Sequence, residues 1–217
     1  LIASEVKNVQ ENVGLCEVNG FNRIEITGSD RHNFLDRIFC GNIKKQTGKV
    51  GLGYFLNHHG MLKGEATIAN LPQSDRGPAR VWYGSAAASE YHDMDWLRQH
   101  LSPNEDVQLK SLTNDLTILV LAGPNARKVL SACSRGDWSK DAFPWLSLRE
   151  CFIGIAPATV MGVSFSGELA YEIHIPNASL YAAYLAIQEA GLEFNIKLFG
   201  ARACLLYTSD AADDTPC

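Results

Sequence analysis

The sequence lacks the features that mark several large classes of protein. It has no cluster of basic residues, and its 19 Lys and Arg are outnumbered by 24 Asp and Glu, for a formal net charge of −5. Three of those acids, Asp210, Asp213 and Asp214, lie near the C-terminus, so the body of the chain is nearly neutral. Because binding to nucleic acid depends largely on neutralising phosphates, no nucleic-acid partner is expected.

Long apolar runs and clustered cysteines are also missing. No run approaches the roughly 20 apolar residues of a membrane-spanning helix, so no membrane partner is expected. The six cysteines are widely spaced, and none forms the CxxC pair typical of zinc and redox sites, which predicts no metal site. The chain has neither a GxGxxG dinucleotide fingerprint nor a GxSxG nucleophile elbow. Ser164, Ser166 and His174 are therefore poor evidence for a hydrolase.

The composition is that of an ordinary globular protein. Of the 217 residues, 46% are hydrophobic and 20% are charged, which is enough apolar material for a substantial core. This length fits one large domain or two small ones. Ser102–Asp106, a short polar stretch containing Pro103, is a possible boundary within the chain.

Residues 204–217 differ from the rest. The stretch CLLYTSDAAD from Cys204 to Asp213 has no hydrophobic periodicity, and it matches the translation of a common transposase sequencing adapter. We therefore predict that residues 204–217 are adapter read-through and that residues 1–203 are native protein, which would continue beyond Ala203. A genuine acidic tail is the alternative.

Short strands alternate with helices along the chain. Glu17–Thr27 carries apolar residues at alternating positions, which predicts a half-buried strand. Gly28-Ser29-Asp30 supply a turn and an N-cap for the helix that follows. Residues 54–71 predict a hairpin with its turn at 57–60. Further strands are expected at 81–83, 107–109, 116–121, 152–155, 159–166 and 171–175, and helices at 87–101, from 123 to 130 and at 179–190.

Tight turns join many neighbouring strands, including the two on either side of Gly167. A doubly wound parallel sheet would need a helix between almost every pair of strands. The pattern therefore predicts an α+β fold, in which helices pack on antiparallel sheets.

Several segments, taken in order, resemble a known family. They resemble the aminomethyltransferase-like (glycine-cleavage T-protein type) folate-binding domain of dimethylglycine and sarcosine dehydrogenases, and the likeness covers residues 1–203. The resemblance implies the aminomethyltransferase folate-binding fold, with its C-terminal barrel missing from this chain. The segments that carry it are ENVGLCEVNGFNRIEITGSDRHNFLDRI, GYFLNHHGMLKGEATIA, LTILVLAGPNARKVL, VSFSGELAYEIHIP and LFGARA.

The resemblance implies a function in one-carbon metabolism. Such proteins bind tetrahydrofolate in this region, and a separate FAD domain upstream oxidises an N-methyl amine to an iminium. Folate then captures the one-carbon unit as 5,10-methylene-tetrahydrofolate. We therefore expect reduced folate as the ligand, the flavin domain of the same full-length chain as a partner, and a bacterial cytoplasmic location. The present chain alone is expected to be inactive.

The resemblance singles out two carboxylates. At the position of Glu65 the family has an Asp or Glu thought to accept a proton from the folate nitrogen that attacks the iminium, which makes Glu65 the candidate catalytic base. The alternative is that strand alternation points Glu65 to solvent. Glu172 matches a carboxylate that accepts paired hydrogen bonds from the pterin ring. The alternative for Glu172 is an exposed strand acid.

Three further residues are candidate folate contacts. Phe165 stands where relatives often have Tyr, so it keeps a stacking face without the hydroxyl. Tyr83 lies on a strand that flanks the pocket in relatives. Either aromatic could instead belong to the core. Arg202 matches an Arg found in some relatives.

Three other functions remain open. The glycine-cleavage aminomethyltransferase shares this domain. A folate-dependent accessory protein for iron–sulfur assembly has the same fold, and its distinguishing motif would fall beyond residue 203. A folate-free scaffold that docks the flavin domain is the third, supported by Phe165. The segments GELAYEI and HDMDW favour the dehydrogenase.

Overall fold

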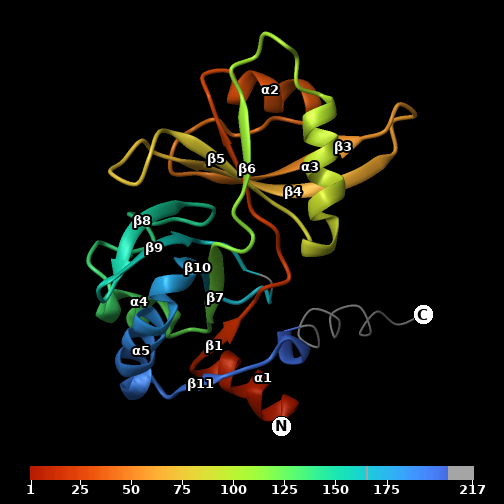
Figure 1. The fold of residues 1–217 in the computed structure, drawn as a ribbon. Coiled ribbons are helices and arrows are strands. Elements are labelled where there is room, and N and C mark those ends of the chain that lie inside the picture. The colour runs from red at the N-terminus through yellow and green to blue at the C-terminus, as the bar shows by residue number, and fades with distance from the viewer. Residues whose placement is uncertain (165, 205–217) are drawn as a thin grey trace, which may run out of the picture. The chain divides into compact units, whose positions relative to one another are not determined.

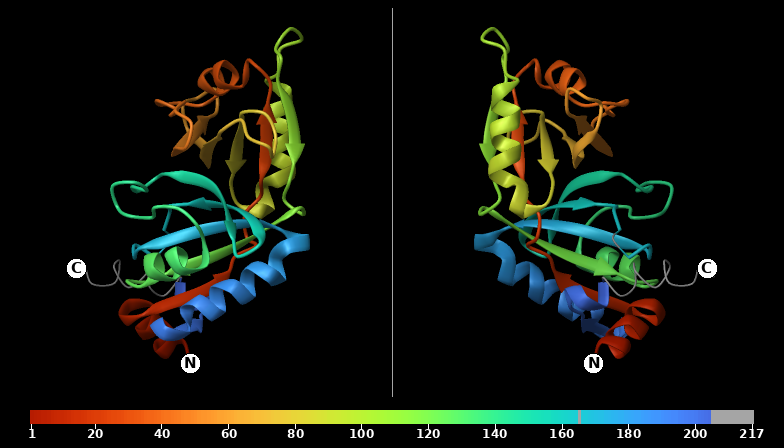
Figure 2. Two further views of the ribbon diagram at one scale, coloured as in Figure 1. Left: turned by 90° about the vertical axis from the view of Figure 1, so that its left-hand side faces the viewer. Right: turned by 90° about the vertical axis from the view of Figure 1, so that its right-hand side faces the viewer.

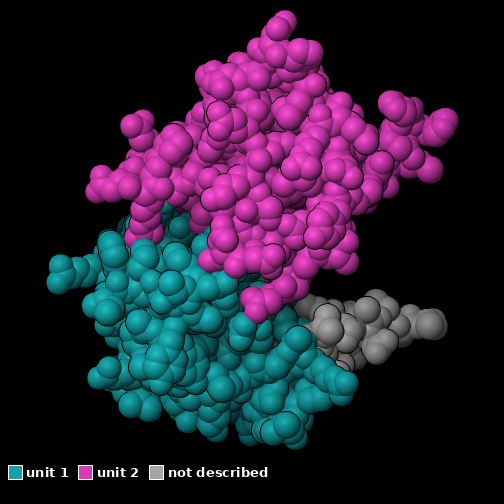
Figure 3. Space-filling model, in the orientation of Figure 1, with its two compact units in different colours: residues 1–18, 116–145, 149–217 teal, residues 19–115, 146–148 magenta. Residues whose placement is uncertain are grey.

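The computed structural model describes residues 1–164 and 166–204, and the chain forms two compact units (Figure 3). Unit 1 contains residues 1–18, 116–145 and those from 149 onward, and unit 2 contains residues 19–115 and 146–148. Unit 2 is thus inserted into unit 1 along the chain. Residues 102–106, where the composition suggested a boundary, lie inside unit 2. Phe165 and residues 205–217 lie outside the described residues.

Unit 1 is built on a six-stranded sheet with the strand order β11-β1-β7-β10-β9-β8 (Figure 1). The edge pair β1 and β11 is parallel, whereas β1–β7, β7–β10 and β10–β9 are antiparallel. Its elements are α1 (Ile2–Glu11), β1 (Val13–Glu17), β7 (Leu116–Ala122), α4 (Ala126–Cys133), β8 (Leu148–Ile153), β9 (Ala156–Met161), β10 (Ala170–Pro176), η2 (Asn177–Ser179), α5 (Leu180–Gly191), η3 (Leu192–Phe194) and β11 (Ile196–Leu198).

The core of unit 1 lies between one face of this sheet and the pair α4 and α5 (Figures 1 and 2). Tyr171, Ile173 and Ile175 alternate along β10 and point to this core, where Val129 of α4 and Ile187 of α5 pack. Each such aliphatic side chain contributes about 1.5–3 kcal/mol when it is fully buried. The residues between them on β10, including Glu172, therefore belong to the opposite face of the sheet.

Unit 2 is built on a five-stranded sheet with the order β3-β4-β5-β2-β6, and all of its pairings are antiparallel. Its elements are β2 (Ile24–Thr27), α2 (Arg31–Ile38), β3 (Val50–Leu56), β4 (Leu62–Leu71), β5 (Arg80–Gly84), η1 (Ala87–Ser89), α3 (Glu90–Gln99) and β6 (Gln108–Ser111).

Aromatic rings fill much of the core of unit 2, between its sheet and the helices α2 and α3. The rings of Phe55 and Trp96 stack with their centroids 4.3 Å apart, and Phe39 meets Phe55 edge-on at 5.8 Å. Tyr83 contributes its ring to the same cluster, 6.0 Å from Phe39. Such pairs add about 0.5–1.5 kcal/mol each beyond the area they bury.

The predicted fold class, antiparallel sheets with packed helices, is confirmed. The predicted hairpin is present as β3 and β4, and its turn is closed by a hydrogen bond from the Asn57 amide to the Met61 carbonyl. β9 and β10 pair as expected on either side of Gly167. Among the described residues, no helix combines the length and the apolarity that crossing a membrane requires.

Four predicted boundaries are wrong. The strand expected at 152–155 is β8, which spans Leu148–Ile153. Glu17–Thr27 is not one strand, because β1 ends at Glu17 in one sheet and β2 begins at Ile24 in the other. The intervening Asn and Gly residues of VNGFNR favour turns over strands. The helix expected from residue 123 begins at Ala126, with Asn125 as its N-cap. The strand expected at 159–166 ends at Met161.

Candidate functional site

Glu172 and His174 form a buried polar pair on β10. Two residues apart on one strand, they share a face of the sheet, the one opposite the core of unit 1. Nε2 of His174 lies 3.1 Å from Oε2 of Glu172, which is a hydrogen-bonding distance. Glu172 is 8% exposed and His174 is 1% exposed, so Glu172 is not an exposed strand acid.

The neighbours of this pair in the sheet are mostly apolar. Register places Val120 of β7 and Met161 of β9 on either side of Glu172, and Ile118 and Thr159 on either side of His174. All four flanking residues are buried. A carboxylate in such surroundings is costly unless it is hydrogen-bonded, and the imidazole of His174 supplies a bond.

Glu65 lies on β4 of unit 2, directly opposite Tyr54 of β3. Its neighbour Ala66 points into the aromatic core, so Glu65 belongs to the opposite face of the sheet, where it is exposed. This is the placement that alternation predicts. An accessible carboxylate is available to a ligand, so its assignment as catalytic base stays a prediction.

Tyr83 is fully buried in the core of unit 2. Its hydroxyl donates a 2.7 Å hydrogen bond to Oδ2 of Asp93, a buried residue in the first turn of α3. Burial, together with the hydrogen bond and the charge of Asp93, raises the pKa of the Tyr83 hydroxyl well above its usual range. Glu65 and Tyr83 thus lie on neighbouring strands, with their side chains on opposite faces of one sheet.

The remaining two candidates give less information. Arg202 is exposed in the short helical turn 201–204 of unit 1. Phe165 lies outside the described residues, so its role as a folate contact stays a prediction.

His174 was not selected from the sequence as a site residue, although a signal for it was present. Glu-x-His on a strand places both side chains on the same face. The second residue that sequence reasoning missed is Asp93, the partner of Tyr83.

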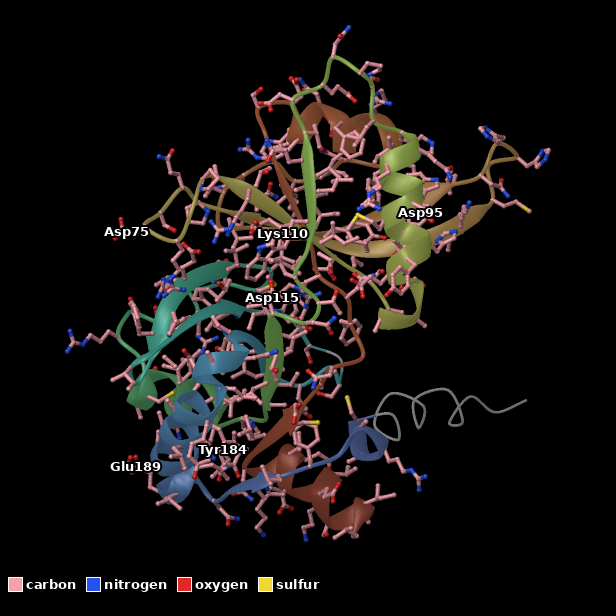
Figure 4. The ribbon with its side chains drawn as sticks, viewed as in Figure 1. Asp75, Asp95, Lys110, Asp115, Tyr184 and Glu189 are labelled. Atoms are coloured by element: carbon pink, nitrogen blue, oxygen red, sulfur yellow. The ribbon has the colours of Figure 1, made fainter. Side chains whose placement is uncertain are left out.

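Unit 1 also contains a cavity of about 420 Å³ beside the N-terminal half of α5. Most of its lining is apolar, and the lining residues with polar groups include Glu17, Asn177, Tyr181 and Tyr184 (Tyr184 is labelled in Figure 4). None of the candidate residues that the structure describes lines this cavity. Within residues 1–164 and 166–204, no group of three or more His, Cys, Asp or Glu side chains is arranged to hold a metal ion.

Comparison with known proteins defines the class of this chain. The family described as the GCVT N-terminal domain matches residues 1–210, and the chain belongs to this family. The predicted resemblance to aminomethyltransferase-like domains is confirmed.

Relatives within the family are longer than this chain. It is 34% identical over 205 residues to the sarcosine oxidase subunit alpha of Rhizobium meliloti (strain 1021), which covers 92% of this chain and 20% of that relative. It is 30% identical over 203 residues to the mitochondrial dimethylglycine dehydrogenase of Homo sapiens, covering 93% and 23%. The chain therefore spans about a fifth of the length of these relatives.

A solved structure supports the fold. The structure of this chain matches the glycine cleavage system aminomethyltransferase T of Bartonella henselae with a TM-score of 0.77 and 18% identity. The match covers 94% of this chain and 52% of that protein. At this identity the likeness establishes the aminomethyltransferase fold alone.

Proposed function

We propose that this chain is the tetrahydrofolate-binding region of an FAD-dependent N-methyl amine dehydrogenase, acting on dimethylglycine or sarcosine. In this role it captures the one-carbon unit of the oxidised amine as 5,10-methylene-tetrahydrofolate. Membership of the GCVT N-terminal domain family supports the proposal, as do relatives named sarcosine oxidase and dimethylglycine dehydrogenase.

The observation that carries the proposal is the buried carboxylate of Glu172. The pterin ring of folate presents an amide N–H beside an exocyclic amine, and a carboxylate accepts such a fork through two parallel hydrogen bonds. Glu172 is hydrogen-bonded on β10 and is flanked by the apolar side chains of Val120 and Met161. An acceptor carboxylate between apolar side chains suits a ring that presents an N–H pair at one edge and a face for van der Waals contact.

Glu65 is the proposed base for carbon capture. The folate nitrogen attacks the iminium carbon, a C–N bond forms, and the nitrogen becomes positively charged. As this bond forms, the C=N electron pair passes to the amine nitrogen, and the carboxylate of Glu65 takes the proton from the charged folate nitrogen. The amine nitrogen, once protonated, leaves as the demethylated amine. The second folate nitrogen then bonds to the same carbon and loses its proton, which gives 5,10-methylene-tetrahydrofolate. FAD would supply the preceding oxidation, and it would be held by a flavin domain elsewhere in the full-length protein.

Isothermal titration of the full-length protein with tetrahydrofolate tests the proposal. Glu172→Gln keeps the size of the side chain but loses the ionised acceptor, so affinity should fall about tenfold or more. Glu189→Gln is the matched control, since it makes the same change of charge at an exposed position of α5 (Figure 4). Equal affinity in both variants, or no binding by the unaltered full-length protein, would overturn the proposal.

The role of Glu65 needs a separate experiment. In the full-length dehydrogenase, Glu65→Gln should leave the dissociation constant of tetrahydrofolate within about threefold, because the residue acts on a proton and not on binding. The yield of 5,10-methylene-tetrahydrofolate per amine oxidised should fall at least about tenfold, with free formaldehyde released in its place. An unchanged yield would remove Glu65 from the mechanism.

A further inference from the structure

We infer that His174 is a positioning residue for folate, which fixes the carboxylate of Glu172 in the orientation that receives the ligand. The inference rests on the proposed function. It extends the site from one carboxylate to two side chains on the same strand. Nε2 of His174 and Oε2 of Glu172 lie 3.1 Å apart.

The chemistry of the contact determines where the proton lies. An ionised carboxylate can only accept hydrogen bonds, so with Glu172 ionised the donor of this bond is the Nε2–H of His174. A carboxylate offers about four acceptor positions, and one imidazole uses one of them. A hydrogen bond from one imidazole is therefore compatible with an N–H pair that the same carboxylate accepts from a ligand.

Because it is buried, the side chain of His174 is restricted in its movement and can hold the carboxylate of Glu172 in place. Its side chain is completely inaccessible to solvent, whereas that of Glu172 is 11% exposed. Ile118 and Thr159 flank His174 in the sheet, and β10 continues to Pro176 beyond it. A glutamate side chain has three rotatable bonds, and a ligand that binds an unheld one must first order it. By holding the side chain, His174 lowers this cost in advance, which is the usual gain from preorganisation.

The test compares substitutions that keep or lose the donor. In His174→Gln the side-chain amide nitrogen can reach the position of Nε2. The side chain of His174→Asn is too short to place its amide nitrogen there. His174→Leu removes all polarity. Titration of the full-length protein with tetrahydrofolate should show affinity within about threefold of the unaltered protein for the Gln variant and about tenfold weaker affinity for the Asn and Leu variants. If the Leu variant does not fold, the Gln and Asn pair carries the comparison.

A double-mutant cycle with Glu172→Gln completes the experiment. His174→Asn should have no further effect on affinity in the Glu172→Gln background, since the carboxylate that it positions is already gone. Asn and Gln variants that bind equally well would overturn the inference and leave the proposed function standing. The inference would also be overturned if the Gln and Asn variants of His174 lost equal thermal stability and kept the affinity of the unaltered protein. That result would indicate that His174 has a structural role alone. A Glu172→Gln variant that binds normally would overturn both.

Discussion

The hydroxyl of Tyr83 on β5 donates a 2.7 Å hydrogen bond to Oδ2 of Asp93 on α3, and so joins the sheet of unit 2 to its helix. The hydroxyl of Ser85 contacts the same oxygen, and Nδ1 of His92 lies 3.0 Å from Oδ1. A buried carboxylate is costly unless its oxygens are paired, and here both are. The network therefore makes Tyr83 part of the structure of unit 2.

Tyr83→Phe should destabilise the protein by about 1–3 kcal/mol, because it withdraws one donor from the buried Asp93 carboxylate. The free energy of unfolding in urea measures the effect. Tyr54→Phe, at a half-buried position of β3, is the control and should change stability by less than about 0.5 kcal/mol. If Tyr83→Phe weakened tetrahydrofolate binding at unchanged stability, the ligand-contact interpretation of Tyr83 would replace this one.

Gly123→Ala should be among the more damaging single substitutions in unit 1. Gly123 has φ of +123°, and a Cβ there would lie 2.6 Å from the carbonyl oxygen of Val9 and 2.7 Å from that of Asn12. Gly41→Ala is matched to it, because Gly41 also has a positive φ, of +89°, but a Cβ there would meet no atom within 4 Å. We expect a loss of about 1 kcal/mol at Gly41 and at least about 2 kcal/mol more at Gly123. Thermal unfolding with equal midpoints for the two variants would contradict this.

The contact between Asp106 and Ser29 predicts a dependence of stability on pH. The backbone amide of Ser29 donates a 2.8 Å hydrogen bond to Oδ2 of Asp106, and the hydroxyl of Ser29 donates a 2.9 Å bond to the same oxygen. These two bonds, the amide's first, hold the pKa of the Asp106 carboxyl below its usual value. A lowered pKa stabilises the fold above the unfolded value of about 4, and this gain is lost as pH falls through the folded pKa.

Ser29→Ala removes one of these donors, so it should lower the thermal midpoint at pH 7 and matter progressively less below about pH 4. Ser131→Ala is the control. The hydroxyl of Ser131 donates to the backbone carbonyl of Arg127, a group that does not titrate. Ser131→Ala should therefore change the thermal midpoint by the same amount at about pH 7 and about pH 2.5. A loss at Ser29 that persists undiminished at pH 2.5 would show that the ionisation of Asp106 is not involved.

Cysteine reactivity should differ sharply among the described thiols. Burial raises the pKa of Cys16 to about 11 and that of Cys133 to about 12, whereas Cys40 is exposed. Because the thiolate is the nucleophile, iodoacetamide at pH 8 should alkylate Cys40 first and the other two much more slowly. Peptide mapping by mass spectrometry measures the rates, and all three should react alike in denaturant. Labelling of Cys16 at the rate of Cys40 in the native protein would refute the prediction.

Local signals in the sequence predicted much of the fold. The hairpin of β3 and β4 has a turn that its own residues specify, and β10 alternates clearly enough to assign its faces. In contrast, α1 carries weak signals, since it buries only Asn8 and Val9 and its N-cap Leu1 makes no side-chain hydrogen bond. The division between β1 and β2 depends on which sheet each strand joins, and that is decided by contacts distant in sequence.

The candidate site was predictable only in part, for a physical reason. Nearly all of β10 is buried, whereas alternation only assigns Glu172 to a face and does not indicate that its side chain is buried. Similarly, α3 has Asp93 and Asp95 two residues apart, and only the fold reveals that Asp93 is buried while Asp95 is exposed (Figure 4). Distances such as that between His174 and Glu172 depend on side-chain rotamers, which a sequence pattern does not determine.

The insertion of unit 2 within unit 1 has a consequence for the order of folding. Glu17 of β1 pairs with Leu119 of β7, so this contact must close a loop of about 100 residues, at an entropic cost that grows with the logarithm of loop length. Every strand of the inserted sheet lies within residues 19–115, and its contacts form at shorter range. During synthesis, a ribosome would therefore release a nearly complete unit 2 while β1 still lacked both of its neighbouring strands. Chaperones that bind exposed strand edges would find β1 available for that whole interval.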